Sequence, residues 1–295
     1  MGLRPKAWDV AIARSYNLES ARNPMAENLV KEYYAGCIHK EWRRLISDPY
    51  HRLEFDTTLH FLEKYLPGKG LILDAGGGPG RYAIELASRG YDVVLQDLTA
   101  ANLRFARRQI KKARIQNKVK EVAEGSITDL SRFADETFDA VVCLGGPLSH
   151  VVDKCERDKA ISEMVRVARK GAPVFASVMG RLSILIVELA MFQHEIELPH
   201  FKQMRDTGDY LGGYGFTSCH FFLPEELEGA FTKRNVEILE MVGLEGISSH
   251  HRKELNRLAK DEKRWETWIE THYGTCTHPA IVGISEHILI ICRKA

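Results

Sequence analysis

The chain has 295 residues, of which 44% are hydrophobic, so it can bury a sizeable core as one large domain or two small ones. Its 41 lysines and arginines against 40 aspartates and glutamates give a formal net charge of +1, which excludes a global charge that would attract nucleic acid or an anionic membrane. The six cysteines form no C-x-x-C pair, a usage typical of a reducing compartment rather than of a disulfide scaffold.

The N-terminal region is predicted to be helical and to carry no targeting segment. The first ten residues lack the apolar run of a signal peptide. Residues 1–65 are expected to form a helical cap, because apolar side chains recur at helical spacing in 56–65. The Pro-Gly-Lys-Gly sequence at 67–70 then punctuates the chain, so we assign 66–295 to the main domain.

From residue 71 the sequence alternates short apolar runs with amphipathic segments. The runs, which predict strands, are 71–75, 92–96, 120–123, 139–144 and 173–178, with two more at 236–241 and 287–292. The segments that predict helices between them are 81–89, 100–114 and 156–169. This alternation is typical of βαβ units and a parallel sheet.

Two stretches interrupt this alternation, and both are long for connections in a compact domain. They are 180–223 and 246–286, and we predict insertions at both places. The most apolar part of the first, 182–192, is too short to cross a bilayer and contains Glu188, so we expect a cytoplasmic protein without a membrane partner.

The glycine-rich loop after the first apolar run is the strongest signal in the sequence. Gly76, Gly78 and Gly80 are spaced G-x-G-x-G, whereas a dinucleotide loop would need its third glycine at Arg81. Glycine permits a tight turn and lets a ligand approach the backbone, and the helix that follows presents free N–H groups. Asp74 would repel a pyrophosphate but can accept a hydrogen bond from an ammonium group, so the pattern predicts a ligand with a cationic end.

A second acidic residue, Asp97, closes the next apolar run. It follows the glycines by about twenty residues, the separation at which an acid binds ribose hydroxyls in sheets of this kind. A nucleoside that carries an amino acid satisfies both acids. S-adenosylmethionine is such a molecule, and we predict it as the cofactor.

The run DAGGGPGRY at 74–82, together with Asp97, resembles class I S-adenosylmethionine-dependent methyltransferases, and the resemblance covers 71–178. It implies a Rossmann-like, doubly wound, seven-stranded sheet with an antiparallel last strand. It also implies that Asp74 and the backbone at Gly76 and Gly78 hold the methionine part, that Asp97 holds the ribose, and that Leu98 packs on the adenine.

Further cofactor contacts are expected around this core. After the third run the family often has Gly-Asp, where this chain has Gly-Ser, so we expect the Ser126 side chain and the main chain at Ile127 to serve the adenine. Gly145, after the fourth run, is expected to offer its carbonyl to the cofactor's ammonium, and Arg81 is included in the same site.

The methionine carboxylate calls for a cation, and we assign Arg52 to it, with Tyr33 and Tyr34 as weaker candidates. His150, after the fourth run, is the candidate general base, although a cap or a packing role explains it equally well. The sequence H-x-x-x-C-x-H at 272–278 lacks the paired spacing of a zinc site, so no metal is predicted.

The sequence therefore predicts methyl transfer by in-line displacement to a small-molecule acceptor. The insertion at 180–223 is expected to cap the acceptor site. The candidate pocket residues in and beside it are Met179, Arg181, Phe192, His194, His200, Tyr210, Tyr214 and His220. Two alternatives stay open: an RNA methyltransferase that uses the basic segment 104–120, and a protein that binds the cofactor without turning it over.

Overall fold

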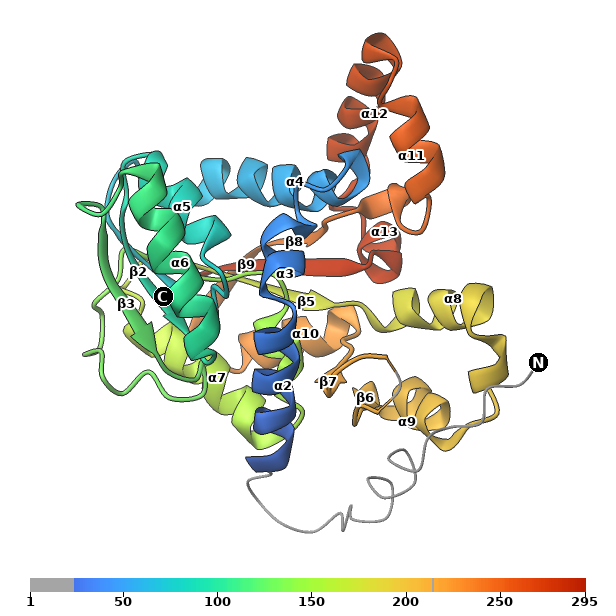
Figure 1. Ribbon diagram of the computed structural model, residues 1–295, viewed down its shortest axis with the longest axis horizontal. Helices are drawn as coiled ribbons and strands as arrows, with labels where there is room; N and C mark the ends of the chain where they lie inside the picture. The colour runs from blue at the N-terminus through green and yellow to red at the C-terminus, as the bar shows by residue number, and fades with distance from the viewer. Residues whose placement is uncertain (1–23, 214) are drawn as a thin grey trace.

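The computed structural model describes residues 24–213 and 215–295, and its centre is a seven-stranded sheet between helices (Figure 1). The strands are β1 (Leu71–Ala75), β2 (Asp92–Asp97), β3 (Val119–Glu124), β4 (Ala140–Cys143), β5 (Pro173–Met179), β8 (Val236–Gly243) and β9 (His287–Lys294). Their order is β3-β2-β1-β4-β5-β9-β8, and β9 runs antiparallel to both of its neighbours. The predicted Rossmann-like sheet with an antiparallel last strand is confirmed.

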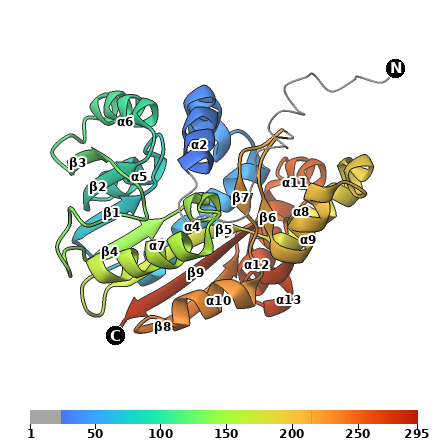
Figure 2. The same ribbon diagram turned by 90° about the horizontal axis from the view of Figure 1, so that it is seen from below.

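Helices cover both faces of this sheet, because its central strands are apolar on both sides and buried throughout. On one face lie α4 (Pro49–Tyr65), α5 (Arg81–Ser88) and α6 (Ala100–Ala113), which share a core with the strands. On the other face lie α7 (Lys154–Val167) and α10 (Pro224–Thr232), as Figure 2 shows. The helix predicted from residue 156 begins at Lys154, since Asp153 accepts a hydrogen bond from Glu156 N and caps it.

The N-terminal helices lie against the first half of the sheet. They are α2 (Pro24–Gly36), α3 (Ile38–Arg44) and α4. Helices α2 and α3 contact α6, whereas α4 is longer than the predicted 56–65 because Asp48 caps it and Pro49 starts it. Phe61 and Leu62 of α4 share the core of Ile72 in β1, so this helix packs into the main core; the boundary at 65 stays a prediction.

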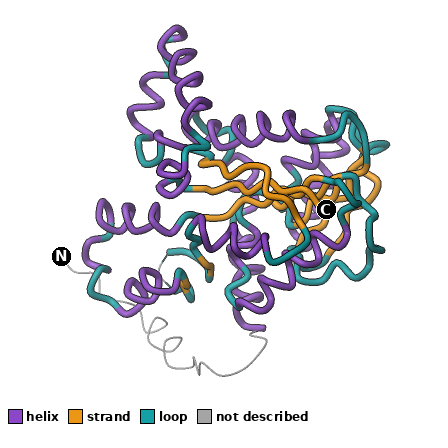
Figure 3. The backbone as a smooth tube through the Cα atoms, turned by 180° about the vertical axis from the view of Figure 1, so that it is seen from behind, coloured by secondary structure: helices purple, strands orange, loops and turns teal. Residues whose placement is uncertain are grey.

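The two long connections have secondary structure of their own. The first contains α8 (Arg181–Met191), η2 (Gln193–Glu195), α9 (Pro199–Thr207), β6 (Asp209–Tyr210) and β7 (Cys219–His220). The second contains η3 (Gly246–Ser248), α11 (Arg252–Leu258), α12 (Glu262–Thr275) and α13 (Pro279–Ile284). Both groups lie beyond the same ends of the strands, the carboxyl ends of β5 and β8, as the view from behind shows (Figure 3). Among the described helices, none combines the length and the apolar character needed to span a bilayer.

Candidate functional site

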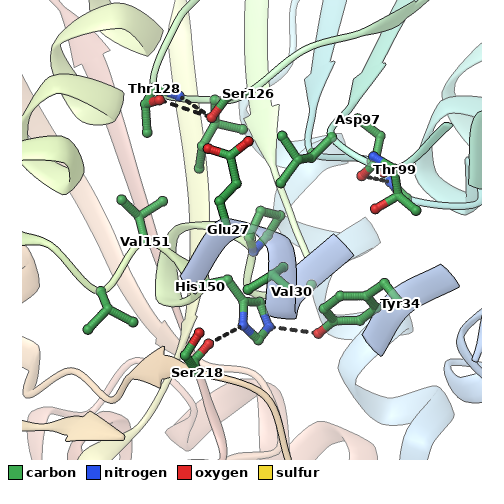
Figure 4. Close-up of a pocket in the computed structure, with 18 of the residues that line it drawn as sticks. Glu27, Val30, Tyr34, Asp97, Thr99, Ser126, Thr128, His150, Val151 and Ser218 are labelled. Atoms are coloured by element: carbon green, nitrogen blue, oxygen red, sulfur yellow. Dashed lines mark hydrogen bonds between the residues drawn. The ribbon is translucent and has the colours of Figure 1, made fainter. Parts of the chain in front are cut away.

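A cavity of about 890 Å³ lies at the carboxyl ends of β1, β2 and β4. The glycine loop, residues 97–102 and residues 125–129 form one wall. Residues 144–159, which include the short helix η1 (Pro147–His150), form another, and α2 and α3 lie across it (Figure 4). Ligands bind at this edge of open α/β sheets, so the fold places the cavity where chemistry is expected.

Backbone hydrogen bonds fix the glycine loop. The N–H groups of Gly76 and Gly77 both donate to the Gln96 carbonyl, at 2.7 and 3.2 Å. Gly78 has φ +55°, and its Cβ position is open, with the nearest atom, Nδ2 of Asn102, at 3.9 Å. A glycine here leaves room for a ligand beside the main chain.

Asp74 lies beneath this loop rather than in the cavity wall. It is fully buried, and a Cβ on Gly77 would lie 2.3 Å from its Oδ2 atom. Burial, with a contribution from Asp97, raises the pKa of the Asp74 carboxyl to about 7. Asp74 is therefore not among the residues that line the cavity, and its contact to an ammonium group stays a prediction.

Asp97 does line the cavity and joins the glycine loop to α6. Its Oδ2 accepts a hydrogen bond from Gly78 N at 2.9 Å, and its Oδ1 accepts from Thr99 N at 2.8 Å and from Asn102 Nδ2 at 3.2 Å. The Thr99 side chain is a further hydrogen-bonding neighbour of this carboxylate, so a ligand would bind by exchanging one of these partners. The Oδ1 atom of Asn102, which also lines the cavity, is buried without a hydrogen-bond partner. Asp97 and Asn102 therefore place acceptor oxygens at this corner of the cavity.

The side of the cavity expected to hold adenine is formed by Leu98, Ser126, Ile127 and Thr128. The Gln96 side chain supports it by donating from Nε2 to the Ser126 carbonyl at 3.0 Å. The Ser126 and Thr128 hydroxyls are hydrogen-bonded to each other at 2.9 Å. This part of the cavity wall therefore combines apolar surface with two hydroxyl groups that can exchange their mutual hydrogen bond for one to a ligand.

Arg44, at the end of α3, is a cavity residue that sequence reasoning missed. Its guanidinium forms a two-point ion pair with the buried Glu54 of α4, and its Nη2 lies 3.7 Å from the Cβ position of Gly145. Arg44 pairs with a residue ten positions away on another helix, so no local pattern signals it.

Behind Arg44, a buried charge network continues through Glu54 to His287 and Glu245. His287 Nδ1 lies 2.7 Å from the Glu245 carboxylate and 3.8 Å from Glu54. Although burial lowers the pKa of His287, the charges of Glu54 and Glu245 raise it to about 9, so the imidazole is cationic at neutral pH. Ligand atoms of the two glutamates and His287 lie within 4.8 Å of one another, and Arg44 pairs with Glu41 as well as with Glu54. The carboxylates of Glu54 and Glu245 are thus engaged in ion pairs with Arg44 and His287.

His150, at the end of η1, lines the opposite part of the cavity. Its Nε2 lies 2.7 Å from the Tyr34 hydroxyl and its Nδ1 lies 3.0 Å from the Ser218 carbonyl (Figure 4). Burial lowers the pKa of His150 to about 4, so the ring is neutral at pH 7. The hydroxyl and the neutral ring together form a polar group in a largely apolar region.

Comparison with known proteins agrees with this geometry. A family model described as "Methyltransferase domain" matches residues 72–171. The chain carries a class I S-adenosylmethionine-dependent methyltransferase domain. This methyltransferase domain contains the glycine loop, Asp97 and His150, so the predicted family is confirmed.

Relatives and solved structures resemble the chain over different extents. Glycine/sarcosine N-methyltransferase of Parasynechococcus marenigrum is 29% identical over 140 residues, 47% of this chain and 48% of the relative. Glycine N-methyltransferase of Mus musculus is 30% identical over 154 residues, 48% of this chain and 52% of the relative. A Methanosarcina mazei structure described as a SAM-dependent methyltransferase is 23% identical with a TM-score of 0.56, covering 79% of this chain and 96% of that one. The chain thus spans about half the length of the curated relatives it matches.

Most of the predicted site residues line the one cavity. These residues are Gly76, Gly78, Arg81, Asp97, Leu98, Ser126, Ile127, Gly145 and His150. Arg52 does not: its side chain is 61% exposed and pairs with Asp56 one helical turn away. The proposal that Arg52 binds the methionine carboxylate is therefore corrected, because the helix turns this side chain to solvent while Arg44 faces the cavity.

The first insertion contributes to the cavity, but through other residues than those expected. Its lining residues are Gln203, Asp209, Leu211 and Ser218. The pocket residues predicted from the sequence do not line it where the structure describes them, and Tyr214 lies outside the described residues. Arg181 and His220 instead both pair with Glu226 of α10, at 2.6 and 2.7 Å, and so connect the insertion to that helix.

Two other sequence patterns do not converge on a site. His272 is hydrogen-bonded to Thr57 at 2.8 Å, while His278 accepts from Ala280 N and caps α13. The basic side chains of 104–120 are not among the residues that line the cavity. Arg107 donates to the Val122 carbonyl, and α6 buries its apolar stripe against the sheet, as in an ordinary surface helix.

Proposed function

We propose that the protein transfers a methyl group from S-adenosylmethionine to the nitrogen of a small amine. The observation that carries this proposal is the cavity itself: Asp97 and the glycine loop lie on one wall, while Tyr34 and His150 face it from another. The cofactor can therefore bind at the wall formed by Asp97 and the glycine loop, while the methyl acceptor binds beside Tyr34 and His150.

The residues present fit the cofactor. Asp97 and the unpartnered Asn102 Oδ1 would accept from its ribose hydroxyls, and Leu98 and Ile127 would pack on its adenine. Arg44 and the N–H groups at the start of α5 supply positive potential for its carboxylate. The bound cofactor supplies a methyl group on a sulfonium, which is already a good leaving group. The protein's own task is to align the two ligands and to exclude water.

Acidic side chains on the far walls favour an amine as the acceptor. Glu27 and Glu41 reach the cavity from α2 and α3, and Asp209 reaches it from the first insertion. Each of these carboxylates already has a partner, Lys31, Arg44 and His220 respectively, so a cationic substrate would bind by exchanging one of them. The names of the similar curated proteins, glycine and glycine/sarcosine N-methyltransferases, support the same class of acceptor.

The test is an assay of S-adenosylhomocysteine formation with S-adenosylmethionine and glycine, sarcosine or ethanolamine as probe. We expect at least one amine to raise product formation above the rate without acceptor, and Asp97→Ala to abolish the increase. Cofactor binding with no turnover by any small amine would support the non-catalytic alternative, and methylation of an RNA pool alone would support the other. Either result would overturn this proposal.

A further inference from the structure

The hydrogen-bond directions around His150 are fixed by its two neighbours. The Ser218 carbonyl can only accept, so at 3.0 Å it requires a proton on His150 Nδ1. Because the ring is neutral, Nε2 then carries a lone pair. The Tyr34 hydroxyl, 2.7 Å away, must donate to it.

This arrangement leaves the Tyr34 oxygen as a hydrogen-bond acceptor at the cavity wall. Its single proton is committed to His150, while its lone pairs remain for a donor. The pair is also held rigidly. Tyr34 and His150 pack edge to face at 5.2 Å, and Phe216 packs on His150 and on the neighbouring Tyr33.

We propose that Tyr34 and His150 form a proton relay that serves an acceptor bearing an N–H or O–H group. This inference rests on the proposed methyl transfer and adds the path of the proton. The acceptor hydrogen-bonds to the Tyr34 oxygen, which makes Tyr34 the catalytic residue. His150 acts through Tyr34 and is a positioning residue whose ring takes up the Tyr34 proton only in passing, because burial lowers the pKa of the imidazole.

Methyl transfer and proton transfer together conserve atoms and charge. The acceptor reacts in its uncharged form, as a neutral amine or a hydroxyl. Its lone pair forms the bond to the methyl carbon, and the carbon–sulfur bond breaks with its electron pair on sulfur. The acceptor's proton passes to the Tyr34 oxygen while the proton of Tyr34 passes to His150 Nε2. The imidazolium keeps its Nδ1–H bond to Ser218 and later releases a proton to water.

Three elements far apart in sequence make this relay, and all three must be in place. Tyr34 comes from α2, His150 from η1, and Ser218 from the segment before β7 in the first insertion. The relay therefore assembles only when the N-terminal helix and the insertion both lie against the domain.

The first test is NMR of ¹⁵N-histidine-labelled protein, which needs no acceptor. At pH 7 we expect His150 to be neutral with its proton on Nδ1, and Tyr34→Phe to shift the Nε2 resonance. A proton on Nε2, or an imidazolium at pH 7, would overturn the relay even if cofactor binding and methyl transfer were intact.

The second test is kinetic, with the amine probe that the methyl-transfer assay identifies. Tyr34→Phe and His150→Gln should each lower kcat by about 10²–10⁴-fold, the range for general acid–base catalysis, with KM for S-adenosylmethionine nearly unchanged. The double variant should cost no more than either single one, because the two residues act as a unit. Tyr33→Phe is the matched control; it keeps the aromatic packing and lies outside the cavity lining.

Wild-type kcat in Tyr34→Phe, or additive losses in the double variant, would refute the relay while leaving the methyltransferase proposal standing. Calorimetry with S-adenosylhomocysteine separates the two proposals. If the variants bind it like wild type, a loss of turnover belongs to the relay. If wild type itself fails to bind it, the proposed function fails instead.

Discussion

Gly77 illustrates how closely single residues are fitted in the loop that faces the cavity. Its Cβ position is 2.3 Å from Asp74 Oδ2 and 2.5 Å from Leu95 Cδ1, so no side chain fits without displacing a buried carboxylate. Asp74 in turn has its pKa raised by burial, which marks a tight apolar surrounding. The loop conformation therefore depends on this glycine as much as on the positive-φ glycines beside it.

Gly77→Ala should lower the free energy of unfolding by about 3 kcal/mol, the upper part of the range for overpacking. The matched control is Gly68→Ala, where the structure places no atom within 4 Å of the new Cβ and the backbone does not need glycine. Urea unfolding monitored by circular dichroism measures both. Equal stability of the two variants would show that the loop relaxes around the methyl group.

Asp97→Ala should weaken S-adenosylhomocysteine binding by roughly 2–3 kcal/mol, as expected for lost hydrogen bonds to a charged group. It should also loosen the glycine loop, because Gly78 N loses its acceptor. Asp92→Ala, at the other end of β2 and paired with Lys118 and Lys120, is the control that should leave affinity unchanged. Unaltered affinity in folded Asp97→Ala would place the ribose elsewhere.

At the residue scale, the sequence was sufficient where chemistry and spacing are local. The glycine loop and Asp97 follow from a short contiguous pattern, and both reach the cavity. Arg44 could not be predicted as a cavity residue, because its partner Glu54 lies on the next helix. Arg52 was assigned wrongly, because the sequence alone does not show which face of the helix packs on the domain and which faces solvent. Tyr34, considered for the methionine carboxylate, is placed beside His150 only by the tertiary fold.

Helix α4 shows how one element connects the N-terminal region to the C-terminal helices. Asp48 caps its first turn through His51 N at 3.1 Å and also pairs with Arg252 of α11. These contacts hold the cap of the helix and a segment about two hundred residues away in the same place. The pairing and the capping together lower the pKa of Asp48 to about 2 against the opposing effect of burial.

Asp48→Ala should destabilise the protein by about 1–2 kcal/mol, the range for a lost helix N-cap. Asp56→Ala on the same helix is the control, because its exposed pair with Arg52 is expected to contribute less than about 0.5 kcal/mol. Thermal unfolding distinguishes the two variants. A destabilisation as small as the control's would mean that water replaces the cap.

The strands of the sheet and the helices between them were predictable from the sequence. A strand that is buried on both faces of the sheet is a continuous apolar run, and the segments between such runs then stand out. The predicted runs 71–75 and 173–178 differ from β1 and β5 by at most one residue. The insertions were recognised by length alone. Their inward-facing residues were not recognised, since the polar groups of Arg181 and His220 pair with Glu226 of α10 and do not line the cavity. A polar residue in an irregular segment gives no sign of the direction in which it points.

The whole molecule should show a pH-dependent stability that originates in the buried charge network. His287 has a folded-state pKa of about 9, raised above its ordinary value by Glu54 and Glu245. Such a group stabilises the fold fully below its unfolded pKa, and this contribution is lost as the pH rises through 9. The free energy of unfolding should therefore fall between about pH 6.5 and 9, by roughly 3 kcal/mol at most.

His287→Gln is expected to be less stable at pH 7 and to lack this slope, since it cannot gain or lose a proton. Chemical unfolding at several pH values between 6 and 9 measures both properties. A variant that retains the wild-type slope would assign the pH dependence to other groups.

The central claim is that the cavity at the carboxyl ends of β1, β2 and β4 binds S-adenosylmethionine. Isothermal titration calorimetry of the wild-type protein with S-adenosylmethionine, S-adenosylhomocysteine and NAD tests it most directly. The G-x-G-x-G loop, the acceptors at Asp97 and Asn102, and Arg44 predict that the first two ligands bind at one site and that NAD does not. Binding of NAD without binding of either sulfur nucleoside would contradict the account.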